Sequence, residues 1–157
     1  MSFRSTPRNR GAGHYHLAAG CLLAALSCAM PLFAEATITV IQVPGAASTQ
    51  LFSINLFGTV TGNYTDANGG THGFVRDPSG AITTFADPAS TATYPQDINV
   101  AGTIVGGWDD TNRMRHSFMR DSEGTITAFD PPQSPNGFWS WATSINAEGA
   151  IVGVSFF

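Results

Sequence analysis

Residues 81–124 read AITTFADPASTATYPQDINVAGTIVGGWDDTNRMRHSFMRDSEG, and the sequence on both sides repeats this stretch. Residues 37–80 form an equally long copy, and residues 125–157 repeat the first part of the stretch with three extra residues before Ser144. The positions shared by all three copies are Ile38/Ile82/Ile126, Pro44/Pro88/Pro132, Ile54/Ile98/Ile145, Asn55/Asn99/Asn146, Gly58/Gly102/Gly149 and Gly62/Gly106/Gly153. Self-similarity at a fixed period of this size indicates a repeat architecture.

Each complete copy contains four short runs with β-strand character, separated by turn signals. In the middle copy these runs are Ile82–Phe85, Tyr94–Ile98, TIVGGW at 103–108 and RHSFMR at 115–120. We predict that the four form one antiparallel blade and that its first strand, Ile82–Phe85, corresponds to ITVIQV at 38–43. One small sheet buries too little surface to offset the entropy of ordering it, so neighbouring blades must cover its faces. The predicted fold class is all-β, with repeated four-stranded antiparallel blades in a β-propeller-like or stacked-blade architecture.

Two kinds of four-residue turn recur in the copies. The first begins with asparagine and ends with glycine, at Asn55–Gly58, Asn99–Gly102 and Asn146–Gly149. Asparagine can bond the backbone two residues on, and glycine at the fourth position accepts a positive φ, so these residues predict type I hairpin turns. The second kind, Asp77–Gly80 and Asp121–Gly124, follows the same logic with aspartate first.

The repeated pattern is S/D-I-N-x-x-G-x-I-V-G-x-Y/W, followed by H-x-F-x-R-D-x-x-G-x-I-T-x-F-x-x-P. It resembles the HAF-repeat family of bacterial exported proteins and extends from Thr37 to Phe157. The resemblance implies a propeller-like or stacked-blade protein outside the cytoplasm, and it implies no particular reaction. A closed propeller needs about four to eight blades, whereas the chain holds two complete copies and a fragment. Several chains assembling a ring, a truncated piece of a longer array and an open stack remain as alternatives.

The N-terminal residues have the features of a secretory signal. An apolar run, Leu17–Ala34, follows a basic leader without acidic residues and precedes the Ala34-Glu35-Ala36 cleavage motif. We therefore expect a signal peptide at 1–36 and a secreted, extracellular or periplasmic protein. An uncleaved membrane anchor, or a lipid anchor on Cys21 or Cys28, is the alternative.

The expected mature chain consists of repeat 1 (37–80), repeat 2 (81–124) and a truncated repeat 3 (125–157). It retains four arginines against ten acidic residues, four minus ten, or a net charge of −6. This charge argues against nucleic acid or an anionic membrane surface as a partner. Both cysteines belong to the removed segment, so the mature chain has neither a disulfide nor a thiol ligand.

His72 and His116 are the first candidates for metal binding or acid–base chemistry. They occupy equivalent positions in two copies, each two residues before a phenylalanine, Phe74 or Phe118. We interpret all four as repeat-structural residues and expect the histidines to hydrogen-bond a neighbouring strand. Two isolated histidines do not satisfy the four-ligand geometry of zinc.

Polar loops follow the third run of each complete copy, at 66–69 and 109–112. Their alternating side-chain oxygens are compatible with calcium, but the same residues are needed by an ordinary polar turn. We favour the turn and expect neither a metal nor a cofactor.

Five aromatic residues form a candidate set, because flat aromatic faces on blade edges bind sugars: Tyr64, Tyr94, Trp108, Trp139 and Trp141. Of these we take Tyr64, Trp108, Trp139 and Trp141 as candidate ligand-binding residues. The alternative is packing between blades, since Trp108 aligns with Tyr64. Trp139 lies in the lengthened stretch of repeat 3, so we expect it to be the most exposed of the four.

No sequence motif for catalysis is recognised. The mature chain has no cysteine or lysine, no Gly-x-Ser-x-Gly elbow and no glycine-rich phosphate loop. We expect an exported repeat protein with a binding or structural role and no catalytic residues. The alternatives are a carbohydrate-binding lectin that completes a propeller by oligomerising, and a truncated remnant of a longer extracellular repeat protein. The expected partners are further copies of the chain and a glycan or cell-surface ligand.

Overall fold

The computed structural model describes residues 37–131 and 139–156. The chain divides after Thr37 into two parts, and the architecture below is that of the second, which begins at Ile38. The predicted signal peptide, residues 1–36, lies outside the described residues. Within the described ranges, no helix is long and apolar enough to span a membrane.

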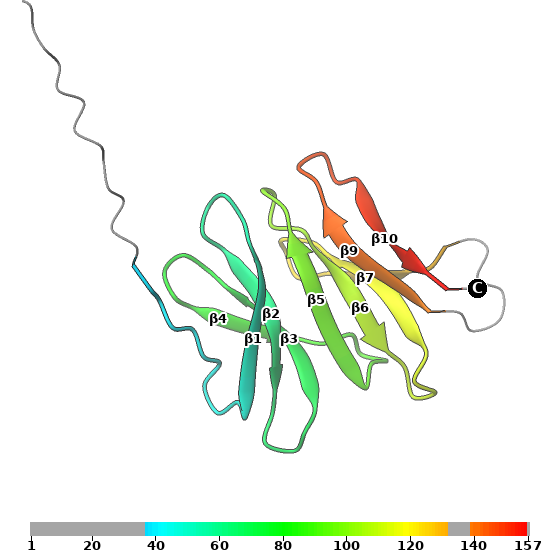
Figure 1. The fold of residues 1–157 in the computed structure, drawn as a ribbon, viewed down its shortest axis with the longest axis horizontal. Helices are drawn as coiled ribbons and strands as arrows, with labels where there is room; N and C mark the ends of the chain where they lie inside the picture. The colour runs from blue at the N-terminus through cyan, green and yellow to red at the C-terminus, as the bar shows by residue number, and fades with distance from the viewer. Residues whose placement is uncertain (1–36, 132–138, 157) are drawn as a thin grey trace, which may run out of the picture. The chain divides into compact units, whose positions relative to one another are not determined.

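All regular elements in the described residues are β-strands, which confirms the all-β class (Figure 1). They are β1 (Ser48–Ile54), β2 (Val60–Thr65), β3 (Thr71–Arg76), β4 (Ile82–Phe85), β5 (Ala92–Ile98), β6 (Ile104–Asp109), β7 (Arg115–Arg120), β8 (Ile126–Phe129), β9 (Ser140–Ile145) and β10 (Ile151–Ser155). Strands β1–β8 form one eight-stranded sheet and β9–β10 form a second, two-stranded sheet. All pairings are antiparallel except that of β3 with β5.

The repeats of the sequence appear as three strand sets. The first set is β1–β4 and the second is β5–β8, and within each set consecutive strands pair in chain order. A single residue pair, Thr71 with Ala92, joins the two sets into one sheet. The third set is the β9–β10 hairpin, which corresponds to β1–β2 and β5–β6. The strand order is open at both ends in the described residues.

The prediction that each copy begins with its own first strand is wrong. Ile82–Phe85 is β4 and pairs with β3 of the preceding copy, because the Asp77–Gly80 turn folds it directly back on that strand. β8 pairs with β7 in the same way. Ile38–Val43 forms no strand, since no equivalent of β3 precedes it in the described residues. The run that opens a copy in the sequence therefore closes the previous strand set in the structure.

The predicted turns are confirmed. The Gly58 N–H donates to the Asn55 carbonyl at 3.0 Å, and the Asn55 side-chain oxygen accepts from the Phe57 N–H at 3.0 Å. Gly58 has φ +82°, a conformation that an L side chain rarely adopts. The turns that begin at Asn99, Asn146, Asp77 and Asp121 close with the same backbone bond.

The glycine at the centre of the third run marks a close backbone approach, as predicted. A Cβ atom at Gly106 would collide with the Tyr94 carbonyl oxygen and with the Phe118 ring. Gly62 and Gly153 face the carbonyls of Gln50 and Trp141 in the same way. These contacts lie beside the β-bulges of β1, β5 and β9, where the strand register shifts.

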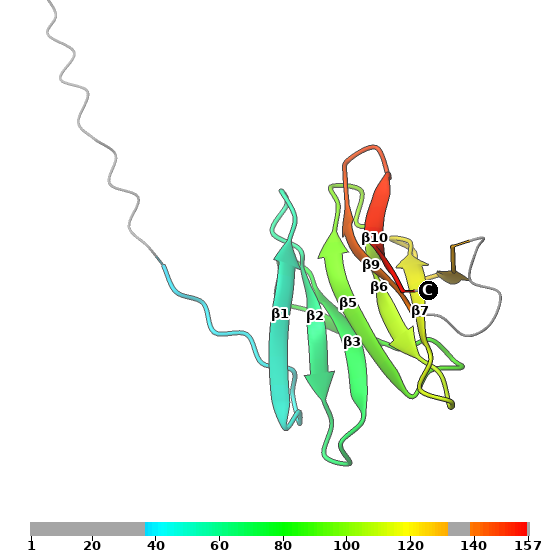
Figure 2. The same cartoon turned by 45° about the vertical axis from the view of Figure 1, so that its right-hand side comes forward.

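Successive strand sets also contact one another through their first strands. β5 contacts β1, β2 and β3, and β9 contacts β5, β6 and β7 (Figure 2). The apolar core follows these contacts in two clusters. One contains Ile98, Ile104, Trp108 and Phe118, packed against Val75 and Phe85 of the first set. The other contains Val105, Ala142 and Ile145, packed against Met119 and Ile151.

A ladder of three equivalent asparagines links the sets. The Asn55 side-chain amide donates to the Asn99 carbonyl at 3.1 Å, and the Asn99 amide donates to the Asn146 carbonyl at 3.1 Å. We call these three residues the asparagine ladder. The interface between the first and second sets is thus repeated between the second and third.

Asp97 on β5 lies between equivalent serines of the neighbouring sets. Its carboxylate accepts hydrogen bonds from Ser53 at 2.7 Å and from Ser144 at 2.6 Å. Burial by itself raises the pKa of Asp97, but the hydrogen bonds from Ser144, Ser53 and two backbone N–H groups outweigh it and lower the pKa. Asp97 therefore stabilises both interfaces in its ionised form.

Candidate functional site

An ion pair lies at the β6–β7 hairpin. Asp109 ends β6, Arg115 begins β7, and the two are cross-strand partners. The Arg115 Nε–H donates to one carboxylate oxygen at 2.7 Å, and its Nη2 donates to the other at 2.9 Å. The bond to Asp109 raises the pKa of Arg115. This two-pronged geometry fixes the plane of the guanidinium group.

Three aromatic rings surround the same guanidinium group. Its central carbon lies 4.6 Å from the ring centroid of Tyr94, 4.4 Å from that of Trp141 and 5.4 Å from that of Trp139. Tyr94 comes from β5, Trp141 from β9, and Trp139 directly precedes β9. We call Tyr94, Asp109, Arg115, Trp139 and Trp141 the Arg115 cluster. Cation–π attraction therefore joins the second strand set to the third.

Trp139 is the exposed member of the Arg115 cluster. The residue is 48% exposed, whereas the Arg115 side chain is only 14% exposed. The Trp139 indole thus has the guanidinium group nearby on one side and a large surface available to solvent. Such an arrangement presents a flat apolar surface next to a fixed set of polar groups.

The other two predicted ligand-binding aromatics lie elsewhere. Tyr64 on β2 packs on His72, its cross-strand neighbour, with ring centroids 5.3 Å apart. Trp108 on β6 stacks on His116 at 4.5 Å, is only 8% exposed and belongs to the apolar core. The structure thus brings Trp139 and Trp141 together but separates them from Tyr64 and Trp108.

The two histidines hydrogen-bond carboxylates that lie in loops rather than groups on a neighbouring strand. A ring nitrogen of His72 lies 3.0 Å from Asp66, and a ring nitrogen of His116 lies 2.7 Å from Asp130. The hydrogen bond with His72 lowers the pKa of Asp66. Each histidine thereby ties its strand to a nearby loop, which agrees with a structural role but not with the predicted partner.

Ser140, Asp130 and His116 form one hydrogen-bonded chain, but not in the order of a hydrolase triad. The Ser140 hydroxyl donates to Asp130, and Asp130 contacts His116. In the part of the chain that the structure describes, no imidazole contacts the serine, and Ser140 is 1% exposed. A nucleophilic serine needs a base within hydrogen-bond reach and access to substrate. The chain of contacts therefore fastens β9 to β7, where Ser140 also contacts Ser117 at 2.9 Å.

The carboxylates of the polar loops are used within their own turns. Asp66 accepts from the Asn68 and Gly70 N–H groups at 2.8 and 2.9 Å. Asp110 accepts from the Asn112 and Met114 N–H groups, both at 2.8 Å. These bonds are the ones that the turn interpretation requires. Among residues 37–131 and 139–156, no group of three or more potential ligands has the geometry to hold a metal ion.

Arg115 was absent from the candidates chosen by sequence, Tyr94 was considered there only as one of the aromatic residues, and Asp109 only as part of a polar loop. One signal was present: Asp109 and Arg115 flank a hairpin turn whose equivalent in the first copy is flanked by Thr65 and Thr71. An opposite-charge pair that appears in only one copy of a repeat has no repeat-structural explanation. Its aromatic neighbours come from two other strands, so the sequence pattern alone did not reveal the cluster.

Comparisons with protein-family models, with curated proteins and with solved structures find no match to this chain.

Proposed function

We propose that this chain is an exported, non-catalytic binding protein of the HAF-repeat type and that the Arg115 cluster is its ligand-binding surface. The recurring H-x-F and I-N-x-x-G motifs and the N-terminal signal features support the family and the export. The repeated contacts between strand sets support a propeller-like stack. The observation that carries the binding role is the exposed Trp139 beside a guanidinium group held by Asp109.

The ligand class that fits this surface best is a carbohydrate. A sugar ring has an apolar C–H face, which stacks on an exposed indole, and hydroxyl groups at its edge, which need charged or polar partners. Asp109 uses only some of the N–H donors of Arg115, and the remaining donors and the carboxylate are placed to serve such hydroxyls. The ion pair holds these groups before ligand arrives, which reduces the entropy cost of binding.

The experiment is a glycan array on the exported protein, followed by calorimetric titration of the glycans that bind. Trp139→Ala is expected to weaken binding by about tenfold or more, because stacking contacts contribute about 0.5–1.5 kcal/mol beyond the area that they bury. Phe57→Ala is the matched control, because Phe57 is also an exposed aromatic residue, 65% exposed, in a turn of the first strand set.

Arg115→Lys separates charge from geometry. Lysine keeps the positive charge but cannot form the two-pronged bond with Asp109, so we expect weaker glycan binding despite an unchanged net charge. Equal glycan affinities of wild type, Trp139→Ala and Arg115→Lys would refute the Arg115 cluster as the site. A glycan array without any binding would refute the carbohydrate ligand.

A further inference from the structure

The interface that joins the strand sets has an unoccupied counterpart on β1. Ile98 and Ile145 occupy equivalent positions on β5 and β9, and they are 4% and 6% exposed because the preceding set covers them. Ile54, their equivalent on β1, is 66% exposed. Among the described residues, nothing covers β1 as the first set covers β5.

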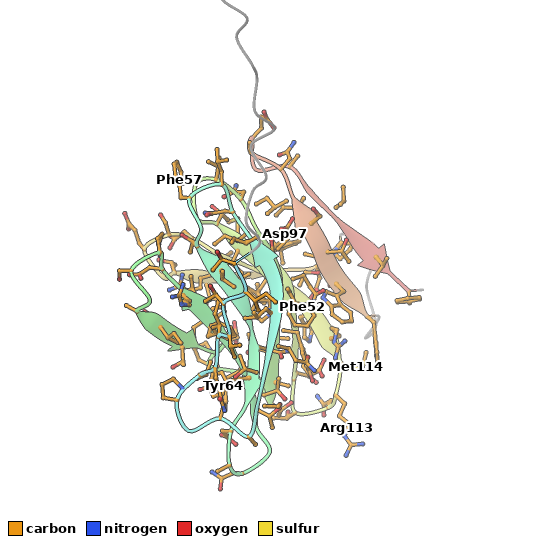
Figure 3. The ribbon with its side chains drawn as sticks, turned by 60° about the vertical axis from the view of Figure 1, so that its left-hand side comes forward. Phe52, Phe57, Tyr64, Asp97, Arg113 and Met114 are labelled. Atoms are coloured by element: carbon orange, nitrogen blue, oxygen red, sulfur yellow. The ribbon has the colours of Figure 1, made fainter. Side chains whose placement is uncertain are left out.

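The surface around Ile54 is hollowed and apolar. A hollow of about 340 Å³ is lined by Leu51, Phe52, Ser53, Ile54 and Val60, and also by Thr39 and Ile41 of the segment before β1. Figure 3 shows Phe52 on β1 and Phe57 in the turn that follows. Leu51 and Phe52 are 46% and 45% exposed, and at the position of Leu51 the other sets have the buried residues Pro95 and Ala142. We call Leu51, Ser53, Ile54 and Asn55 the β1 face.

The β10 strand carries the complementary counterpart. Val105 on β6 is fully buried against Ala142 and Ile145 of the following set. Its equivalent on β10 is Val152, which is 63% exposed, and Val154 beside it is 46% exposed. We call Val152, Val154, Ser144 and Asn146 the β10 face.

The polar contacts of the repeated interface can also form between two chains. In the asparagine ladder, each side-chain amide donates to the backbone carbonyl of the asparagine in the next set. Asn146, the last member, has no following set among the described residues, and the Asn55 carbonyl has no preceding one. An Asn146 amide from one chain therefore matches the Asn55 carbonyl of another.

We propose that the β10 face of one chain docks on the β1 face of a second copy, head to tail, and so repeats the interface already formed twice within the chain. Val152 then contacts Leu51 and Ile54 of the next copy as Val105 contacts Ala142 and Ile145. The contact is heterologous, so it closes into a ring or grows as an open stack. Each copy supplies three strand sets, which begin with β1, β5 and β9, and two copies supply six sets, within the range of about four to eight blades in closed propellers.

No residue of either face carries a charge, so the association is expected to depend little on salt. This feature separates the proposed contact from one made by the acidic surface of the chain. The proposal does not rest on glycan binding, because the Arg115 cluster lies on other residues.

The test is sedimentation of the purified exported protein over a range of concentrations. Wild type is expected to form dimers or larger assemblies as its concentration rises. Ile54→Asp and Val152→Asp are each expected to weaken association by more than about tenfold, because either places a carboxylate in an apolar contact. Val100→Asp is the control. Val100 is 38% exposed and lies in the equivalent turn of the second set, whose contacts with the first and third sets already form within the chain.

Mixing the two variants tests the head-to-tail arrangement. Ile54→Asp keeps an intact β10 face and Val152→Asp keeps an intact β1 face, so the mixture is expected to form a heterodimer that neither variant forms alone. Trp139→Ala is expected to associate as wild type does, even if it has lost its ligand. A wild-type protein that stays monomeric overturns the proposal and points to another occupant, such as a further repeat of a longer chain. A mixture that does not associate, or an equal effect of Val100→Asp, also overturns it.

Discussion

Replacing Ile98 by alanine is expected to destabilise the fold far more than the same replacement of Ile54. Both isoleucines end the first strand of their set, but Ile98 is 4% exposed and Ile54 is 66% exposed. At Ile98 the change removes about three buried methylene-sized groups at about 0.8 kcal/mol each, so it costs about 2.4 kcal/mol before any cavity term. Only about a third of the Ile54 side chain is buried, so the same replacement there lowers the free energy of unfolding by less than about 1 kcal/mol.

The assay is urea unfolding at a protein concentration low enough for the wild type to be monomeric. Ile98→Ala is expected to lower the midpoint by about 1–2 M without changing the m-value. Ile145→Ala, at a residue 6% exposed against the second set, is the positive control and is expected to behave like Ile98→Ala. An equal loss of stability for Ile54→Ala and Ile98→Ala would refute the stacking of one strand set on the next.

Three further results follow from the contacts between the sets. The pKa of Asp97 in the folded state lies below its ordinary value of 3.8. Its contribution to stability is therefore complete above that pH and is lost as the pH falls through the lowered pKa. Asp97→Asn is expected to lack this loss of stability at acidic pH when urea midpoints at neutral and acidic pH are compared. Asn99→Ala removes the acceptor for the Thr103 N–H and the bond to the Asn146 carbonyl, so the free energy of unfolding measured in urea is expected to fall by about 1–3 kcal/mol. Asn146→Ala is expected to lower it less, since the Asn146 amide donates to no following set in the described residues. A synthetic peptide of residues 115–130 is expected to bind beside β10 and to slow the amide exchange of β10. The Phe118 ring packs against Gly106 of β6, and a hollow of about 160 Å³ lies at Gly153, the equivalent position of β10, where the Phe118 ring of the peptide would fit. A peptide with alanine in place of that phenylalanine is the control, and equal binding of both peptides would contradict this analogy.

The turns and the strand character were predictable because their causes are local. Asparagine followed three residues later by glycine specifies a hairpin turn whatever surrounds it, and Asn55, Asn99 and Asn146 all form that turn. The glycine of each third run was predictable for the same reason, since only glycine tolerates the close approach of a bulged strand. Repetition of these signals in register identified the strand sets.

The pairing of Ile82–Phe85 was mispredicted because the repeat has no marked beginning. A periodic sequence can be divided at any point, and the position chosen placed this run before Tyr94–Ile98 rather than after Thr71–Arg76. The structure divides it at the Asp87–Thr91 loop, since the Asp77–Gly80 turn is tight enough to return the chain onto β3 at once. The Asp77–Gly80 hairpin turn was recognised in the sequence, but its shorter connection was not used to decide the pairing.

The Arg115 cluster was only partly predictable, because it is assembled from four strands, β5, β6, β7 and β9. Trp139 and Trp141 were candidates from composition and loop length. Tyr94 and Arg115 join them only because β9 packs across β5 and β7, a contact between strand sets that no local pattern encodes. The bonds of Asp97 to Ser53 and Ser144 depend on the same stacking and were not foreseen.

The most direct test of the repeated interface is a disulfide between two copies. The mature chain predicted to start at Thr37 has no cysteine of its own, so Ile54→Cys and Val152→Cys each introduce a single thiol. Ile145 and Val105, the equivalents of these two positions, share one apolar cluster within the chain. Under mild oxidation, an equimolar mixture of the two variants is expected to form a covalent heterodimer faster than either variant forms a homodimer. Equal rates in the mixture and in the separate variants would contradict the head-to-tail repetition of this interface.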